Sequence, residues 1–256
     1  REACCNPVAA GASAGAVELP ASAAADSTAV RRIDGLAGVP VVDVCAGAAH
    51  AIALSSAGGC FAWGRNNHAQ CGLASDVEVV WAPRRVCGLP HVANVAAGRA
   101  HSLFTERSGA GVWACGRNHA GQLGLDAGED VAAPRRLPPA IEDLWRGTRV
   151  VEVACGDAHS LLALASGAVV AVGSDRARAC FGSRADQGAP TTTTRTLRHV
   201  VVLDARPEAR LVVAALAAAG DASVVIADYG AADAAALGSP TRGVGYARAG
   251  ASSPSW

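Results

Sequence analysis

A glycine-centred block recurs four times along the chain, and this recurrence limits the possible fold more than any other feature. The copies read AGAAHAIAL (46–54), AGRAHSL (97–103), CGDAHSLL (155–162) and AGDASVVI (219–226). In the first three copies a histidine stands three residues after the glycine, whereas the fourth copy has Ser223 there. The shared residues are Gly47, Gly98, Gly156 and Gly220, with His50, His101 and His159.

A second glycine follows each first one at a nearly constant distance. It lies 17 or 18 residues later in every copy, whereas the spacing from one copy to the next grows from 51 to 64 residues. Constant spacing within a module and variable spacing between modules is typical of fixed strands joined by loops of different lengths. The second glycines are Gly64, Gly116, Gly173 and Gly238.

Each module holds four short runs rich in Val, Ala and Leu. In the first module these runs are 41–46, 50–55, 59–63 and 83–86. Four such runs within about 50 residues predict a four-stranded antiparallel sheet, the blade of a β-propeller. Glycines interrupt every stretch long enough for a helical repeat, so we expect an all-β fold with helix confined to the insertion 138–148 and the chain ends. The expected blades lie near 41–86, 92–136, 150–200 and 211–246.

Composition excludes several classes of protein. Lys+Arg and Asp+Glu are both 22, so the chain lacks the basic excess of proteins that coat nucleic acid or anionic membranes. Hydrophobic residues are 51%, which excludes a disordered chain, and no apolar run reaches the about 20 residues of a membrane-spanning helix. All basic residues are arginine, which removes lysine-based catalysis. The absence of methionine indicates a processed, trimmed or partial chain.

The nine cysteines include no C-x-x-C pair, and most of them lie in apolar runs. An unpaired cysteine in such a run behaves as a small hydrophobic residue. We therefore expect reduced thiols in an intracellular, reducing compartment, with cytosolic, ciliary and mitochondrial settings all left open.

Two further motifs complete the module. FAWGRN (61–66) is followed by HAQCGL (68–73), and WACGRN (113–118) is followed by AGQLGL (120–125). Together with the G-x-x-H blocks, these motifs resemble the repeats of the regulator of chromosome condensation (RCC1) family.

The resemblance covers about residues 29–246 and implies a β-propeller of about seven blades. Only four modules are recognisable, so we expect a propeller that is incomplete or irregular at its ends. The flanking segments 1–28 and 247–256 are rich in Ala, Gly and Ser and match no repeat. We expect them to be extended segments that partners tie down, or disordered when the chain is alone.

The recurring polar residues are predicted to serve the scaffold. Glycine at the anchors suits positive φ angles and close approach of backbones. A histidine that returns once per blade favours a hydrogen bond within or between blades, with a ring of metal ligands as the alternative. Gln70 and Gln122 are expected to bond loop backbone, and Asn66 and Asn118 to support tight turns. We predict no cofactor and no metal.

Contacts with partners are predicted on the loops. Three arginines lie in turn segments and could cluster on one rim of the propeller. Two tryptophans lie in variable segments between modules, where they suit an interface hot spot or, as the alternative, a local packing anchor. The candidates are Trp81, Trp145, Arg146, Arg65, Arg99 and Arg117.

The sequence carries none of the catalytic or nucleotide-binding motifs searched for, G-x-S-x-G, H-E-x-x-H and the Walker loop. The favoured hypothesis is a non-catalytic propeller that binds protein partners as a subunit of a larger assembly. The first alternative, implied by the resemblance, is guanine-nucleotide exchange on a small GTPase, for which the insertion 138–148 is the nearest candidate wedge. The second is contact with chromatin or RNA through an arginine-bearing rim, which the zero net charge disfavours.

Overall fold

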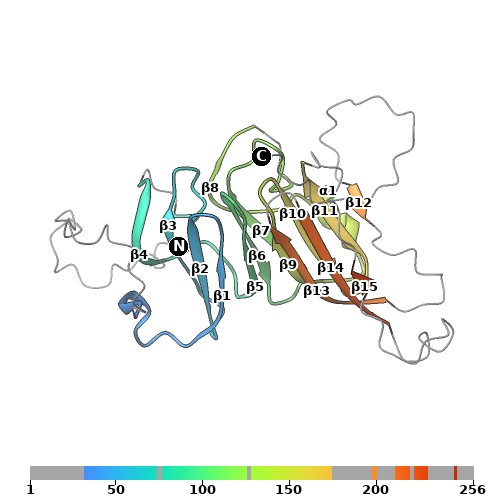
Figure 1. Ribbon diagram of the computed structural model, residues 1–256, viewed down its shortest axis with the longest axis horizontal. Coiled ribbons are helices and arrows are strands. Elements are labelled where there is room, and N and C mark those ends of the chain that lie inside the picture. Colours follow the sequence, from blue (N-terminus) through green and yellow to red (C-terminus); the bar gives the residue numbers. More distant parts are fainter. Residues whose placement is uncertain are drawn as a thin grey trace, which may run out of the picture.

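The computed structural model describes residues 32–73, 77–125, 128–174, 198–200, 211–219, 222–229 and 245–246. Within these residues the chain forms four antiparallel sheets that follow one another in sequence order (Figure 1). The predicted all-β fold is confirmed, and the four sheets occupy the four predicted ranges.

The first three sheets each have four strands in simple sequence order. The first comprises β1 (Val41–Ala46), β2 (His50–Ser55), β3 (Cys60–Arg65) and β4 (Val79–Arg85). The second comprises β5 (Val92–Ala97), β6 (His101–Glu106), β7 (Val112–Gly116) and β8 (Val131–Arg136). The third comprises β9 (Val150–Cys155), β10 (His159–Leu164), β11 (Val169–Gly173) and β12 (Arg198–Val200).

The fourth sheet shows three strands among the described residues, where four were expected. They are β13 (Leu211–Ala219), β14 (Ala222–Tyr229) and β15 (Gly245–Tyr246). The predicted anchors Gly220 and Gly238 and the flanking segments 1–28 and 247–256 lie outside the described residues.

Register explains why the module spacing is constant. In each of the first three sheets the repeat histidine pairs with the second glycine across the second and third strands: His50 with Gly64, His101 with Gly116 and His159 with Gly173. A one-residue slip would move every side chain to the opposite face of the sheet, so this pairing is strictly specified. The longer insertions lie beyond the third strand or between sheets, and the one extra residue of the second module lies in the turn between β6 and β7.

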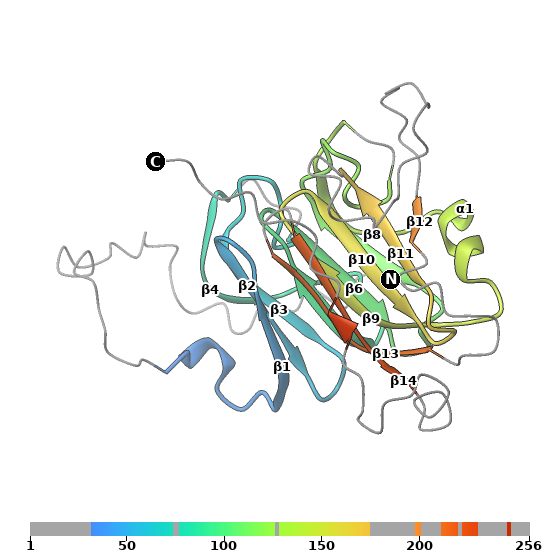
Figure 2. The same cartoon turned by 45° about the vertical axis from the view of Figure 1, so that its right-hand side comes forward.

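The sheets stack face to face through their inner strands. β5 contacts β1 and β2, β9 contacts β5 and β6, and β13 contacts β9 and β10, and Figures 1 and 2 show these sheets side by side. Two apolar clusters fill the first two junctions: one around Ile52, Phe104 and Cys115, the other around Leu103, Leu123 and Leu162. Burial of these side chains is the main favourable term in holding the sheets together.

Helical structure among the described residues is limited to three short pieces. The insertion forms α1 (Pro139–Glu142) and the 3-10 helix η3 (Asp143–Trp145), and a second 3-10 helix, η2 (Asp34–Leu36), precedes the first sheet. Pro139 at the first helical position suits its fixed φ. No helix among the described residues is long and apolar enough to cross a membrane.

Candidate partner-binding rim

In the first three sheets, the turn between the first two strands is built around a glycine and a histidine. A Cβ added to Gly47 would lie 2.1 Å from the carbonyl oxygen of Gly98 and 2.6 Å from the ring of His50. The same conflict arises at Gly98, with His101 and the Gly156 carbonyl. Glycine is needed here because the histidine ring and the next sheet fill the space that a side chain would occupy.

The expectation of positive φ is wrong for these first glycines, whereas the expected close approach of backbones is confirmed there. Positive φ is found at the second glycines instead. Gly64, Gly116 and Gly173 have φ angles of 103°, 100° and 110°, whereas Gly47 and Gly98 are not among the positive-φ residues. The second glycines also lie close to the turn between the first two strands: a Cβ added to Gly64 would be 2.6 Å from the Ala49 carbonyl oxygen. The two anchors therefore need glycine for different reasons: close approach at the first, backbone conformation at the second.

The repeat histidines join neighbouring sheets. His50 Nε2 lies 2.9 Å from Ser102 Oγ, and Ser102 Oγ donates to the Gln70 carbonyl oxygen at 2.7 Å. The second junction repeats this with His101, Ser160 and Gln122 at 3.0 and 2.7 Å. We call each His–Ser–Gln-carbonyl set a latch. The predicted hydrogen bond between blades is confirmed at both latches.

The latch sets the protonation of its histidine. Serine has one hydroxyl proton, and it is given to the glutamine carbonyl, so the histidine Nε2 must be the donor to the serine. Nδ1 of His50 and of His101 then has a free lone pair, and both atoms are buried without a hydrogen-bond partner. Burial accordingly lowers the pKa of His50 to about 4 and that of His101 to about 3, where His50 and His159 also contribute.

Two amides organise the segment that follows the third strand. Asn66 Oδ1 accepts from Cys71 N at 3.0 Å, and Gln70 Oε1 accepts from His68 N at 2.9 Å. The second sheet repeats both contacts, with Asn118 accepting from Leu123 N at 3.1 Å and Gln122 from Ala120 N at 2.9 Å. The predicted backbone-bonding roles of these amides are confirmed.

These turns and segments lie at one end of the sheets, which we call the rim: residues 47–49, 65–73, 98–100, 117–125 and 128–130. Arg65 N donates to the Ala49 carbonyl oxygen at 2.7 Å, and Arg117 N to that of Ala100 at 2.8 Å. Both arginine side chains are exposed, and neither forms an ion pair with a described residue. Arg99 lies on the same rim and pairs with Asp157 of the third sheet at 3.3 Å. The structure thus brings the three predicted arginines to one end of the fold.

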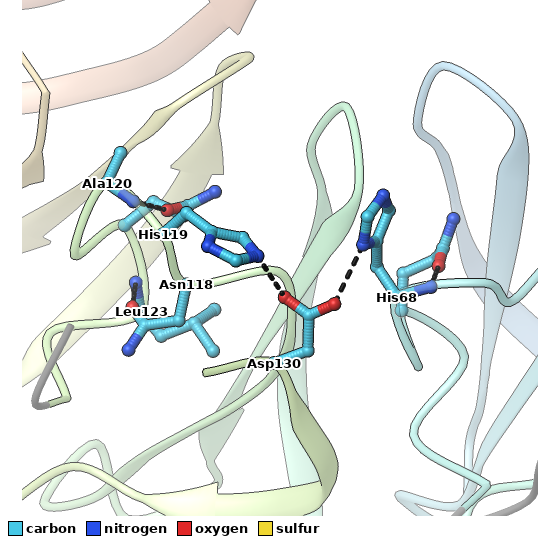
Figure 3. Close-up of polar contacts among 8 residues, drawn as sticks. His68, Asn118, His119, Ala120, Leu123 and Asp130 are labelled. Carbon is cyan, nitrogen blue, oxygen red and sulfur yellow. Dashed lines mark hydrogen bonds and ion pairs between the residues drawn. The ribbon is translucent and has the colours of Figure 1, made fainter. Parts of the chain in front are cut away.

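A polar cluster on the rim was missed by sequence reasoning. The carboxylate of Asp130 lies between two imidazoles, with Oδ2 2.8 Å from His68 Nδ1 and Oδ1 3.4 Å from His119 Nε2 (Figure 3). His68 belongs to the segment after β3, and His119 and Asp130 to the segment between β7 and β8. Repeat comparison conceals the cluster, because Ala120 occupies the position of His68 and Asn67 that of His119.

The two tryptophan candidates have opposite environments. Trp81 is 67% exposed on β4, whereas Trp145 is 3% exposed and its Nε1 donates to the Ala110 carbonyl oxygen at 3.3 Å. Trp145 packs in the second apolar cluster, so its prediction as a surface contact is corrected to the alternative, a packing anchor. Its neighbour Arg146 is exposed and pairs with Asp143.

The buried thiols of the described residues are poor nucleophiles. Cys60 and Cys71 are buried, and burial raises the pKa of their thiols to about 12 and about 11, which disfavours the nucleophilic thiolate. Within the described ranges, no group of three or more His, Cys, Asp or Glu is arranged to hold a metal ion.

Family comparison identifies the repeat. Models of the regulator of chromosome condensation (RCC1) repeat match residues 41–70, 57–105 and 110–163, which together span the first two sheets and the inner strands of the third. The chain carries RCC1 repeats. The resemblance inferred from the glycine and histidine motifs is therefore confirmed, and the latch is a contact between adjacent RCC1 repeats.

Two human relatives illustrate the match. The probable E3 ubiquitin-protein ligase HERC3 is 39% identical over 151 residues, which is 58% of this chain and 14% of HERC3. Protein RCC2 is 36% identical over 131 residues, 50% of this chain and 24% of RCC2. The chain therefore spans a small part of either relative.

Two solved structures, one of them yeast RCC1 (Prp20), have the same fold. Human WBSCR16 superposes with a TM-score of 0.58 at 23% identity, covering 74% of this chain and 45% of WBSCR16. Prp20p from Saccharomyces cerevisiae superposes with a TM-score of 0.55 at 22% identity, covering 73% of this chain and 43% of Prp20p. The four sheets are therefore blades of the RCC1 β-propeller type.

Proposed function

We propose that this RCC1-repeat chain is a non-catalytic scaffold that binds protein partners as a subunit of a larger assembly. The observation that carries the proposal is that the recurring polar residues form hydrogen bonds within the scaffold, whereas arginines on the rim are exposed. The repeat histidines, serines and amides hold sheets and loops together, whereas Arg65 and Arg117 are exposed on the rim and form no ion pair with any residue that the structure describes. Rigid scaffolds with exposed side chains on one set of loops are suited to recognition.

The rim is the proposed contact surface, with Trp81 beside it on β4. Backbone hydrogen bonds fix both Arg65 and Arg117 against the neighbouring turn, so little ordering of the main chain is needed on binding. Trp81 is two-thirds exposed and does not belong to the apolar cluster in which Trp145 packs. Exposed arginine and tryptophan are the residue types enriched at interface hot spots.

Known binding by RCC1 proteins supports association with proteins. Prp20p binds Gsp1p and histones, and a second structure has Kap60 bound to yeast RCC1 (Prp20). Guanine-nucleotide exchange remains the alternative function, but its proposed wedge loses support. The insertion 138–148 folds as α1 and η3, and its tryptophan packs into the core of this chain.

The test reverses the rim charges. Arg65→Glu combined with Arg117→Glu should reduce the amount of specifically captured partner by about tenfold or more in quantitative affinity purification. The matched control is Arg84→Glu with Arg135→Glu, which makes the same charge change at exposed positions of the outer strands β4 and β8. Equal capture by the rim variant and the wild type would refute the rim as the contact surface.

A separate assay tests the exchange alternative. The purified chain is added to a panel of small GTPases loaded with a fluorescent nucleotide, and nucleotide release is followed. We expect no acceleration. A hundredfold acceleration on any one GTPase would replace the scaffold with an exchange factor.

A further inference from the structure

We propose that two copies of this chain associate end to end, with the first blade of each copy bound to the fourth sheet of the other. The four sheets stack in sequence order, so the first and the fourth are the two ends of the stack (Figure 1). The second blade covers one face of the first blade, and we call the opposite one the open face. The proposal concerns this face and does not depend on the partner-binding rim.

The open face presents to solvent a position that the next two blades bury. Three residues before the first glycine of each of these modules stands a valine. Val95 and Val153 are 7% and 6% exposed and belong to the apolar clusters of the two junctions, whereas Val44 is 58% exposed. Val42, on the same strand, is 62% exposed. Exposed apolar side chains gathered on one strand mark a site of association.

The turn of the first blade also lacks a backbone contact that the next two turns have. The carbonyl oxygen of Gly98 accepts from Ala48 N at 3.3 Å, and that of Gly156 accepts from Arg99 N at 3.2 Å. Each of these bonds joins one blade to the turn of the next. Gly47 stands at the same repeat position, and its carbonyl oxygen accepts no backbone hydrogen bond from a residue that the structure describes. The first blade therefore offers an acceptor to the turn of a further sheet.

The latch indicates which kind of sheet fits the open face. Ser102 and Ser160 each follow the repeat histidine of their own blade and contact the histidine of the preceding blade. In the first blade this position is Ala51. A sheet with the repeat histidine would bury its Nε2–H against a methyl group, and a buried donor without an acceptor is costly. The open face therefore favours a sheet that lacks this histidine.

The fourth sheet meets this requirement. Ser223 stands where the first three modules have the repeat histidine, and it is the one polar residue in the ranges 211–219 and 222–227. The sheet packs on the third blade through β13, with Ala218 against the apolar cluster of that blade. The fourth module has thus lost the histidine of a latch, and the first module has lost the serine, at Ala51. Contact between these two ends leaves no imidazole unpaired.

The fourth sheet that covers the open face belongs to a second copy. Within one chain two blades lie between the two ends, and the latch fixes the junction between those blades. The chain covers 45% of WBSCR16 and 43% of Prp20p, so its four sheets correspond to somewhat under half of either solved protein. Two copies related by a twofold axis cover both ends in two identical junctions and form a ring of eight sheets. Propellers have about four to eight blades, so a ring of this size is within their range.

The first test is the mass of the purified full chain, measured by light scattering over a series of protein concentrations. We expect twice the 25.5 kDa of one chain. Val44→Arg should raise the dissociation constant by about a hundredfold or more, because it buries an unpaired charge in each junction. The variant should fold, because Val44 is exposed in the single chain. Val77→Arg is the matched control, an exposed valine before β4 whose substitution should leave the double mass unchanged.

A mixing experiment shows which faces meet. Val224 pairs with Ala217, and the next residue, Ala218, packs on the third blade, so the register places position 224 on the other face of the fourth sheet. Val224→Arg should therefore also give the mass of a single chain. An equimolar mixture of Val44→Arg and Val224→Arg should recover the double mass, because one junction between the two variants carries no substitution. A mixture that stays monomeric overturns the proposal.

Hydrogen exchange of the wild type is an independent measurement that needs no variant. Exchange in 41–46 and in 222–229 should slow as the protein concentration rises, whereas exchange in 131–136, on the outer strand of the second blade, should not change. A chain that is monomeric at every concentration overturns the proposal, and residues 1–31 or a different protein would then be the cover of the open face. A dimer that Val44→Arg leaves intact, or that Val77→Arg disrupts equally, also overturns it. So does a dimer that Val44→Arg disrupts and Val224→Arg does not, because two open faces would then meet each other.

Discussion

The junction between the first and second blades and the junction between the second and third share one latch but differ in what surrounds it. At both, a histidine Nε2 meets a serine Oγ at 2.9 or 3.0 Å, and the serine donates to a glutamine carbonyl at 2.7 Å. The first junction adds the thiols of Cys60, Cys71 and Cys115 and, on its rim, the contacts of Asp130 with His68 and His119. The second adds the apolar insertion with Ile141 and Trp145.

The difference between the two junctions distinguishes contacts made by repeat residues from contacts made by the variable segments. The latch recurs because its residues stand at repeat positions, and it sets the distance and register between blades. The surroundings differ because they come from variable segments: α1 and η3 cover the second junction from outside, whereas the first relies on side chains of the rim. Each of the following predictions tests one side of this contrast.

The largest expected effect is at the insertion. Trp145→Ala should lower the free energy of unfolding by about 3–5 kcal/mol, because it removes a large buried side chain from the second junction. Chemical denaturation measures the change. Trp81→Ala is the matched control, with an expected effect within about 0.5 kcal/mol because Trp81 is exposed. A loss below about 1 kcal/mol for Trp145→Ala would show that the insertion is not part of the core.

Acid should weaken both latches. The pKa of His50 is lowered to about 4 and that of His101 to about 3, below the ordinary value of 6.5 in the unfolded chain. Stability from these groups is therefore complete above pH 6.5 and is lost as pH falls from 6.5 towards 4, by up to about 1.4 kcal/mol per pH unit for each histidine. Unfolding measured between pH 7 and 5 tests it, and stability that rises throughout this range would contradict neutral latches.

Removing the histidine of one latch at a time compares the contribution of each latch to the free energy of unfolding. His101→Ala should cost about 1–3 kcal/mol, as expected for a lost buried hydrogen bond, and His50→Ala should cost somewhat less because His50 is 4% exposed and His101 is fully buried. Thermal and chemical unfolding measure both. Retention of a bound, stoichiometric transition metal that is lost in His101→Ala would replace the structural role with a metal site.

A smaller and stabilising change is expected at the second junction. Thr105 Oγ1 is buried without a hydrogen-bond partner, and the equivalent position of the first blade is Leu54, which is part of the first apolar cluster. Thr105→Val keeps the shape and removes the unpaired hydroxyl, so it should raise the free energy of unfolding by about 1 kcal/mol. Destabilisation by this variant would mean that the hydroxyl has a partner, such as an ordered water.

The smallest expected effect lies on the rim of the first blade. Ala69 has a φ of 58°, and its counterpart in the second blade is Gly121 at 72°. Ala69→Gly should stabilise the chain by about 0.5–1 kcal/mol, because glycine adopts this conformation without steric cost. The reverse change, Gly121→Ala, should destabilise by a similar amount. Opposite signs in the two variants confirm that backbone conformation is the cause.

The sequence by itself determined the repeat, and with it the strands, their antiparallel order and a hydrogen-bonding role for the repeat histidine; the structure placed that bond between blades. Gly64 and Gly116, with His50 and His101, stand at fixed offsets because they pair across adjacent strands, and pairing of that kind leaves a period in the sequence. The roles of Asn66 and Gln70 were also readable from the sequence, since they act on backbone a few residues away.

Only the tertiary structure decided the features that depend on contacts between variable segments. Trp81 and Trp145 look alike in sequence, yet one is exposed and the other buried, because the burial of Trp145 depends on the fold of α1 and η3 over the second and third blades. The contact of Asp130 with His68 and His119 gives no periodic signal, because these three residues stand at positions that the repeats do not share. Periodic contacts can be read from one chain because they recur, whereas a contact made once, between distant segments, exists only when the blades are stacked.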